Sequence, residues 1–319
     1  MNLLFICDPI EKLNFSKDST IFLIERAWER GYECRVCTIE DLSLQVNSKR
    51  TRVIAKTTLI KKFNSENIWY QEVELTTLNL NEIDIIFLRT DPPFDEKYHA
   101  ATMILDVAVD QGVKIFNCPK ELRNHNEKLS ILKFNNYIMP TLISSNKQEL
   151  IEFSKNHEKV VFKPLNEMGG NGVFVVEKTD FNIPTIIETL TEQGKNKIVG
   201  QKFIPDIIEG DKRILILNGK IVDCALARVP KKGSYIGNLA AGGNPIIKPL
   251  SELDFQIAGD VGSALAPKGF FIIGIDIIGK YLTEINVTSP TGFKEITKLT
   301  KINLGEIFYS EVSKLLGTS

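Results

Sequence analysis

Short apolar runs alternate with amphipathic stretches over the first third of the chain. The apolar runs predict buried strands, and apolar spacing of three and four predicts helices. The strands are expected at residues 2–7, 32–39, 83–88 and 113–116, and the helices at 19–31 and 102–112. Such alternation is typical of a doubly wound α/β domain with a mostly parallel sheet, whose ligands bind at the carboxyl ends of the strands. Asp8-Pro9 and the segment DPPFD at 91–95 follow two of these strands, so we expect both to be binding loops.

From about residue 125 the pattern changes to α+β with antiparallel hairpins. Asn218-Gly219 joins two apolar runs and is a strong hairpin signal. We predict helices at 126–137, 147–156, 185–194, 252–266 and 304–316. We predict strands at 197–203, 213–217, 221–228, 270–278 and 281–287, with a further hairpin formed by KVVF and VFVVE on either side of residues 163–172.

Composition narrows the class of protein. The chain has 319 residues, of which 43% are hydrophobic and 25% charged, so a packed core is expected. The net charge of −1 and the lack of long basic runs argue against nucleic-acid binding. The longest apolar run, residues 270–275, is far shorter than the ~20 residues of a membrane-spanning helix, so no membrane association is expected.

Cysteine and histidine usage argues against several kinds of site. Five scattered cysteines are best interpreted as free thiols in a reducing cytoplasm, although Cys34 and Cys37 have the spacing of a redox motif. The three histidines lie outside every motif below, so a nucleophilic triad is not expected.

The segment KPLNEMGGNG, residues 163–172, is too long and too rich in glycine for a tight turn. Glycines expose backbone N–H groups to phosphate oxygens, and Lys163 could add an ammonium group. The two commonest phosphate-loop motifs are absent, and a strand follows Gly172. We therefore expect a hairpin tip that folds over phosphates, with an ordinary flexible hairpin as the alternative.

A candidate metal site lies near the C-terminal end. Asp276 interrupts an apolar strand, and Glu284 and Asn286 share one face of the next strand because they are two residues apart. Three such oxygen ligands suit Mg²⁺. A two-residue turn at Gly279-Lys280 would place Asp276 on the other face, so the metal hypothesis predicts a three-residue turn or a bulge. Exposed polar side chains are the alternative.

Two arginines, Arg213 and Arg228, lie on the two arms of one predicted hairpin. Guanidinium groups bind phosphate and carboxylate through two hydrogen bonds. Near a metal site, the pair favours anion binding over ordinary surface arginines.

These features together resemble the ATP-grasp superfamily. Within it, the chain resembles bacterial glutathione synthetases over its whole length, through the motifs DPI, KDST, DPPFD, NEKL, KPLNEMGGNG, GDKR, LARVP, GNLAAGG and DIIGKYLTEINVTSPT in this order. The resemblance implies an N-terminal substrate domain at 1–124, a central ATP-grasp lid subdomain at 125–204 and a C-terminal catalytic subdomain at 205–319. It also implies ATP-dependent joining of γ-glutamylcysteine to glycine through an acyl phosphate, in a cytoplasmic homotetramer with no nucleic-acid partner.

The resemblance further implies roles for single residues. Arg213 and Arg228 would stabilise the transferring phosphoryl group, and Asp276, Glu284 and Asn286 would hold Mg²⁺, with Mn²⁺ as a possible substitute. ATP would contact Lys128, Lys163, Glu167, Met168, Gly169, Gly170, Asn171 and Gly172, with its adenine at Gln201, Lys202, Phe203 and Ile204. Ser289, Pro290 and Thr291 would bind the peptide substrate, and residues 230–243 would form a mobile lid.

The chain departs from the family pattern at two positions, and two other functions stay open. Ile236 stands where an arginine commonly precedes GNLAAGG, and Thr90 stands where a lysine often precedes DPPFD. The alternatives are another ATP-grasp carboxylate–amine ligase, such as a D-alanine–D-alanine or peptide-tail glutamate ligase, and a non-catalytic ATP-binding regulatory module.

Overall fold

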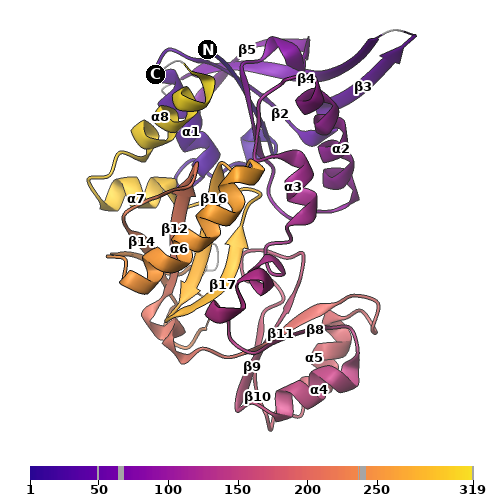
Figure 1. Cartoon of the computed structure of the whole chain (residues 1–319), viewed down its shortest axis with the longest axis vertical. Helices are drawn as coiled ribbons and strands as arrows, with labels where there is room; N and C mark the ends of the chain where they lie inside the picture. The colour runs from indigo at the N-terminus through magenta and orange to yellow at the C-terminus, as the bar shows by residue number, and fades with distance from the viewer. Residues whose placement is uncertain (49, 64–67, 236, 238–241, 318–319) are drawn as a thin grey trace.

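The computed structural model of the chain describes residues 1–48, 50–63, 68–235, 237 and 242–317. Over these residues the strands form three sheets, of seven, four and six strands (Figure 1). Among the described residues, short 3-10 helices lie in the connections at Ile10–Lys12, Ile39–Asp41, Leu80–Glu82, Pro205–Glu209 and Ala266–Lys268. No helix in the described part of the chain is long and apolar enough to cross a membrane.

The first sheet has the predicted parallel core. Its parallel strands run in the order β2-β1-β6-β7, namely Glu33–Cys37, Asn2–Cys7, Ile85–Arg89 and Ile115–Phe116. Leu3 and Phe5 of β1 pack with α1 (Ser19–Trp28) and α8 (Leu304–Leu316), whereas Leu4 and Ile6 pack with α2 (Glu96–Asp110) and α3 (Pro119–Asn124). Successive residues of this apolar run point to opposite faces, so β1 is buried between helices on both sides, which is the doubly wound arrangement that the sequence predicted.

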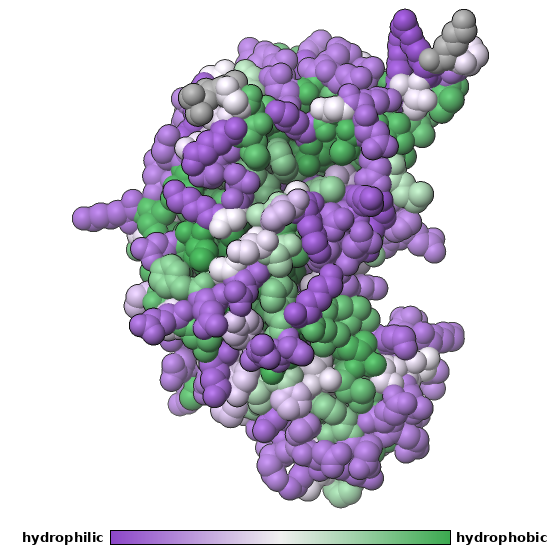
Figure 2. Space-filling model, in the orientation of Figure 1, coloured by the Kyte–Doolittle hydropathy of each residue, from purple (hydrophilic) through white to green (hydrophobic). Residues whose placement is uncertain are grey.

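Three antiparallel strands that the apolar pattern did not predict extend this sheet. They are β3 (Leu42–Asn47), β4 (Arg50–Lys62) and β5 (Tyr70–Asn79). Most of β3 and β5 is exposed, so these strands lack the alternation that marks a half-buried strand. The arm at the upper right of Figure 1 is formed by β3 and the start of β4, and β5 pairs with the rest of β4 at the top of the view. Figure 2 shows both hydrophilic and hydrophobic residues on this arm.

The central part of the chain forms a small lobe with its own core. Its antiparallel sheet has the order β10-β9-β11-β8, namely Phe174–Glu177, Lys159–Pro164, Ile198–Lys202 and Thr141–Ser144. Helices α4 (Lys147–Lys155) and α5 (Ile183–Leu190) pack on it through residues such as Leu150, Phe162 and Ile187. The predicted helix at 126–137 is wrong: residues Ser130–Tyr137 form a 3-10 helix, with non-helical backbone at Phe134.

The C-terminal sheet has the order β15-β14-β12-β16-β17, with β13 also paired to β12. These strands are Asn244–Lys248, Ala225–Val229, Asp211–Leu217, Ile272–Ile278 and Tyr281–Asn286, and β13 is Lys220–Ile221. The predicted hairpin turn at Asn218-Gly219 is confirmed, since β12 pairs with β13 directly across it. Helix α6 (Glu252–Leu265) packs against β12 and β16, and α7 (Phe293–Leu299) follows the last strand.

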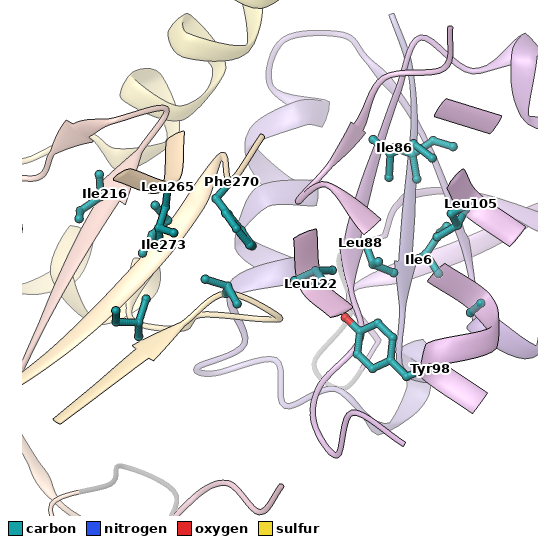
Figure 3. Packing of buried hydrophobic residues seen from close by; sticks show 14 of the residues in the cluster. Ile6, Ile86, Leu88, Tyr98, Leu105, Leu122, Ile216, Leu265, Phe270 and Ile273 are labelled. Carbon is teal, nitrogen blue, oxygen red and sulfur yellow. The ribbon is translucent and has the colours of Figure 1, made fainter. Parts of the chain in front are cut away.

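The N-terminal and C-terminal sheets share one hydrophobic core. Figure 3 shows Phe270 and Leu122 between side chains of the first sheet and side chains of β12 and β16. Asn117 joins the same two parts through polar contacts. Its amide donates to the carbonyl oxygens of Ile272 and Val287, at 2.7 and 2.5 Å, and its oxygen accepts from the N–H groups of Phe271 and Ile272, at 2.8 and 2.9 Å. This junction fixes β16 and β17 relative to the first sheet.

Candidate functional site

A cleft with a volume of about 480 Å³ lies between the four-stranded and six-stranded sheets, with loops of the N-terminal domain at one end. It brings together most of the residues that the sequence singled out, but Asp8 and Pro9, expected to form a binding loop, do not line it. Of the predicted site residues, all except Gly172 and Pro290 line it. The carboxyl-end loops of the first sheet contribute Asp91, Pro92 and residues 12–14 and 17–18.

One face of the six-stranded sheet changes from apolar to polar along its strands. Leu215 and Leu217 of β12 belong to a hydrophobic core, whereas Asp211 and Arg213 of the same strand line the cleft. All four point to the same face because they are separated by even numbers of residues. The polar end of this face is therefore built by strand periodicity rather than by loops.

A β-bulge brings the three predicted metal ligands to this face. Gly279-Lys280 forms a two-residue connection, but the register shifts after Asp276, and Thr283 is the extra residue. As a result Asp276 pairs directly with Glu284, and Asn286 pairs with Gly274. The bulge that the metal hypothesis requires is therefore present. The Asn286 amide also donates to a carboxylate oxygen of Asp276, at 3.2 Å.

Asp276 is the centre of a buried ion-pair cluster. Arg213 lies directly opposite it on β12 and donates two hydrogen bonds to its carboxylate, at 2.5 and 2.8 Å. Arg228 reaches the same carboxylate at 2.8 Å and also pairs with Asp211. Burial opposes ionisation of Asp276, but the charges of the two arginines hold its pKa below the usual range.

Asp211 was not predicted as a site residue. Burial raises its pKa to about 6, against the opposing effect of the Arg228 charge. Among the described residues, one of its carboxylate oxygens has no hydrogen-bond partner. The signal for it lies in GDKR, since a residue two positions before Arg213 on a strand must share its face.

Two lysines face Glu284, of which Lys128 is buried and Lys163 is half-buried. The Lys128 ammonium lies 3.2 Å from the Glu284 carboxylate and donates to the carbonyl oxygen of Glu167 at 2.5 Å. Lys163 on β9 lies within 3.5 Å of the carbonyl oxygen of Thr283. Burial lowers the pKa of Lys163, partly offset by the charge of Glu284. Two ammonium groups beside a carboxylate suit a ligand that brings several negative charges into the cleft.

The glycine-rich segment forms the predicted hairpin tip between β9 and β10, and residues 167–171 line the cleft. Its glycines at 169, 170 and 172 have positive φ angles. At Gly172 an added Cβ would lie 3.0 Å from the Pro164 ring, so the loop closes only with glycine at this position. Gly172 is therefore placed by the turn itself and not by contact with the cleft.

Gln201, Lys202, Phe203 and Ile204 line one end of the cleft at the end of β11. The Gln201 amide donates to the Thr141 hydroxyl at 3.0 Å, which fixes this side chain against β8. Tyr235, which sequence reasoning missed, lines the cleft beside Phe203. It follows a segment without hydrophobic periodicity, so no pattern pointed to it.

Ser289 and Thr291 line the opposite end of the cleft. Pro290 does not line it, and its carbonyl oxygen accepts a hydrogen bond from the buried Arg89 at 3.0 Å. Glu127, also missed, fixes the preceding segment: its carboxylate accepts from the N–H groups of Val287 and Thr288 and from the Thr288 hydroxyl, at 2.8 to 3.1 Å.

The two departures from the family pattern have different outcomes. Thr90 is buried and does not line the cleft, and within the described residues its hydroxyl has no hydrogen-bond partner. Ile236 lies outside the described residues, as do residues 238–241 of the predicted lid. In the described part of the chain, no three His, Cys, Asp or Glu side chains gather as a metal-binding group, so a metal here would depend on the Asn286 amide as well as on carboxylates.

Asp91, which lines the cleft beside Ser289, provides a test of its electrostatics. Burial raises its pKa to about 6, although a hydrogen bond from Ser289 works in the opposite direction. Because the folded-state pKa exceeds the unfolded value, the stabilisation by this carboxyl group is full below about pH 4 and is lost as the pH rises through 6. The difference in unfolding free energy between Asp91→Asn and wild type should therefore change by about 2 kcal/mol in favour of the variant from pH 4 to pH 7.5.

Urea unfolding of both proteins across this pH range checks the expectation. Asp110→Asn, at an exposed carboxylate of α2, is the control and should follow the wild-type curve. Parallel curves for wild type and Asp91→Asn would show that Asp91 titrates like an exposed carboxylate.

Two family models match the chain in succession. The model described as prokaryotic glutathione synthetase, N-terminal domain, matches residues 1–123, and the model described as prokaryotic glutathione synthetase, ATP-grasp domain, matches residues 127–301. A glutathione synthetase of Nitrosomonas europaea is 42% identical over 307 residues, which cover 95% of each chain. A glutathione synthetase of Ralstonia nicotianae is 40% identical over 317 residues, which cover 99% of this chain and 97% of the relative.

Solved structures show the same fold at much lower identity. A D-cycloserine synthetase superposes with a TM-score of 0.67 at 12% identity, over 99% of this chain and all of the other. The ATP-grasp ligase PsnB, complexed with a minimal precursor, superposes with a TM-score of 0.62 at 14% identity, over 97% of this chain and 98% of its own. At such identities the likeness concerns the fold alone.

Proposed function

The chain belongs to the prokaryotic glutathione synthetase family, and from this premise we propose which residues of its cleft bind each substrate and act in each step of the reaction. It is an ATP-dependent ligase that forms glutathione. The two substrates to be joined are then γ-glutamylcysteine, through its cysteinyl carboxylate, and glycine, through its amine. A carboxylate has no good leaving group, so ATP must supply one.

The lysine side of the cleft binds the ATP phosphates. Lys128 and Lys163 lie on either side of Glu284, and the tip at 167–171 faces the same space. The buried ammonium of Lys163 gains a counter-charge when phosphate enters, which offsets the cost of its burial. The adenine lies at residues 201–204, where β11 ends at the cleft.

The residues present fit a divalent metal ion. Asp276, Glu284 and Asn286 share one face of paired strands, and two carboxylates with an amide oxygen are the hard ligands that Mg²⁺ prefers, with Mn²⁺ as a chemically similar substitute. The unpaired oxygen of Asp211 lies on the same face of the sheet. When bound, Mg²⁺ supplies charge neutralisation for the ATP phosphates.

The arginines act when the phosphoryl group moves. One oxygen of the cysteinyl carboxylate attacks the γ-phosphorus, the bond from this phosphorus to the bridging oxygen breaks, and ADP leaves. Arg213 and Arg228 stabilise the negative charge of the transferring group, because both guanidinium groups are held on the cleft face of neighbouring strands.

The second step forms the peptide bond. The glycine nitrogen attacks the carbonyl carbon of the acyl phosphate, and phosphate leaves with one oxygen of the former carboxylate. Ser289 and Thr291 orient the peptide, since the Glu127 contacts hold the strand end just before them. Starting from its ammonium form, the glycine nitrogen loses two protons to water and keeps one N–H in the peptide bond.

The observation that carries the proposal is the buried cluster of Asp276, Arg213 and Arg228, which shares one cleft with the two lysines at 128 and 163. Its direct test is isotope transfer. With ¹⁸O in both oxygens of the cysteinyl carboxylate, one labelled oxygen should appear in each phosphate released, as measured by mass spectrometry. Glutathione formed without ¹⁸O in phosphate would exclude the acyl phosphate.

We propose the following organisation for the whole protein. Segments 1–124, 125–204 and 205–319 act as substrate domain, lid subdomain and catalytic subdomain, which is supported by the presence of one sheet in each. The five free cysteines fit a cytoplasmic location. A homotetramer is supported by the family resemblance, and light scattering after size exclusion tests it.

A further inference from the structure

Tyr235 has a defined position at the adenine end of the cleft. Its ring meets the Phe203 ring edge-on, with 5.0 Å between the centroids. The Lys159 ammonium lies 5.1 Å from the centroid of Tyr235 and 5.4 Å from that of Phe203. It also donates to the Tyr235 hydroxyl at 3.4 Å. The ring is therefore held against the central lobe by an aromatic neighbour and a cation.

The cation itself is fixed in place. The Lys159 ammonium lies 3.3 Å from the Glu177 carboxylate on the neighbouring strand β10, and the two residues pair directly. Hydrogen bonds to Glu177 and then to Tyr235 raise the pKa of Lys159, so the group stays charged near neutral pH. A charged ammonium between two ring faces gives Tyr235 a preferred orientation.

Tyr235 separates the cleft from a second hollow. A depression of about 370 Å³ lies on the outer side, lined by Lys159, Val175, Glu177, Thr179, Asp180 and Tyr235. Tyr235 and Val175 line both spaces, whereas residues 201–204, which include Phe203, line only the cleft. The ring thus forms a wall, and its removal would open the adenine end of the cleft towards the depression.

We propose that Tyr235 is a nucleotide-positioning residue whose ring, seated on Phe203 and Lys159, forms the wall against which the adenine base of ATP packs. The inference rests on the proposed nucleotide site at residues 201–204. A flat apolar ring with a polar edge suits the face or edge of a purine, and such contacts act on the base alone. The phosphates, which face Lys128 and Lys163, are outside its reach.

The test separates the base end from the phosphate end. In Tyr235→Ala, the Kd values for ATP and ADP should rise by the same factor, about fivefold to tenfold, because both share the adenine. The inhibition constant of tripolyphosphate, which has no base, should stay at the wild-type value. The kcat at saturating ATP should change less than twofold while the KM for ATP rises with the Kd.

Matched variants sharpen the result. Tyr235→Phe keeps the ring and should retain most of the affinity, whereas Lys159→Met removes the cation and should weaken ATP and ADP binding about twofold to threefold. In the double variant with Tyr235→Ala, the Lys159→Met change should weaken ATP and ADP binding little further, because Lys159 acts on the nucleotide through the Tyr235 ring. Phe181→Ala is the control, since Phe181 lies in the same lobe and its side chain is 98% exposed.

The possible outcomes are distinct. Unchanged ATP and ADP affinity in Tyr235→Ala would overturn the proposal, and so would an equal loss of tripolyphosphate binding. Lys163→Met should weaken tripolyphosphate together with ATP. Wild-type protein that binds neither ATP nor ADP would instead overturn the nucleotide site on which the inference depends.

Discussion

Asp276→Asn is expected to lower kcat about a thousandfold, which corresponds to about 4 kcal/mol of lost transition-state stabilisation. Two effects combine in this variant. The cleft loses a charged ligand for the metal. The Asn amide group also faces guanidinium N–H groups whose hydrogen bonds the Asp276 carboxylate accepts in the wild type. The second effect acts on the fold as well. Breaking a buried ion pair on one side typically costs about 3 kcal/mol of unfolding free energy.

Glu284→Gln is the informative partner of this variant. Within the described part of the chain, Glu284 forms an ion pair with Lys128 alone, and it is more exposed than Asp276, so its loss should cost about 1 kcal/mol of stability or less. Turnover should nevertheless fall by a similar factor, since the same metal would lose a ligand. Comparing the two variants therefore separates the effect on turnover from the effect on stability. Turnover close to wild type in both variants, measured as ADP release, would remove the metal assignment.

Arg213→Lys and Arg213→Met should both reduce turnover, to different degrees. The guanidinium of Arg213 holds the Asp276 carboxylate through two parallel hydrogen bonds, an arrangement that a lysine cannot reproduce. We expect a loss of about 100-fold in kcat for the lysine variant, which keeps the charge, and about 1,000-fold for the methionine variant.

The KM values distinguish this role from simple ATP binding. If Arg213 acts mainly on the transferring phosphoryl group, kcat falls while the KM for ATP changes little. Lys268, an exposed lysine on the short 3-10 helix after α6, provides a control, and Lys268→Met should be neutral. A large rise in KM with an unchanged kcat would show that Arg213 serves ground-state binding instead.

The sequence predicted the elements whose apolar residues mark burial. Strands β1, β12 and β16 are apolar runs buried on both faces, β9 alternates and α8 is amphipathic, and the structure has all of them close to the expected bounds. It did not predict β3 and β5, whose residues are mostly exposed and carry no such pattern. It also gave the wrong type for residues 130–137, where tertiary contacts replace a regular α-helix by a kinked 3-10 helix.

The candidate site could be predicted where a chemically costly residue interrupts an apolar run. Asp276 is such a residue, and its burial beside two arginines explains why the strand tolerates it. The bulge at Thr283 could not be chosen from sequence, because two registers fit the same spacing. Glu127 and Tyr235 were missed since each acquires its role from a neighbour distant in sequence, whereas Asp211 could have been found from its position two residues before Arg213.

The central claim is that one cleft joins two substrates at the expense of ATP. Its most direct test is the rate of ADP release by the purified protein with ATP and Mg²⁺, after adding γ-glutamylcysteine alone, glycine alone and both together. We expect sustained release only with both substrates, one ADP for each glutathione formed. No release with both substrates, from protein that still binds ATP, would contradict the account.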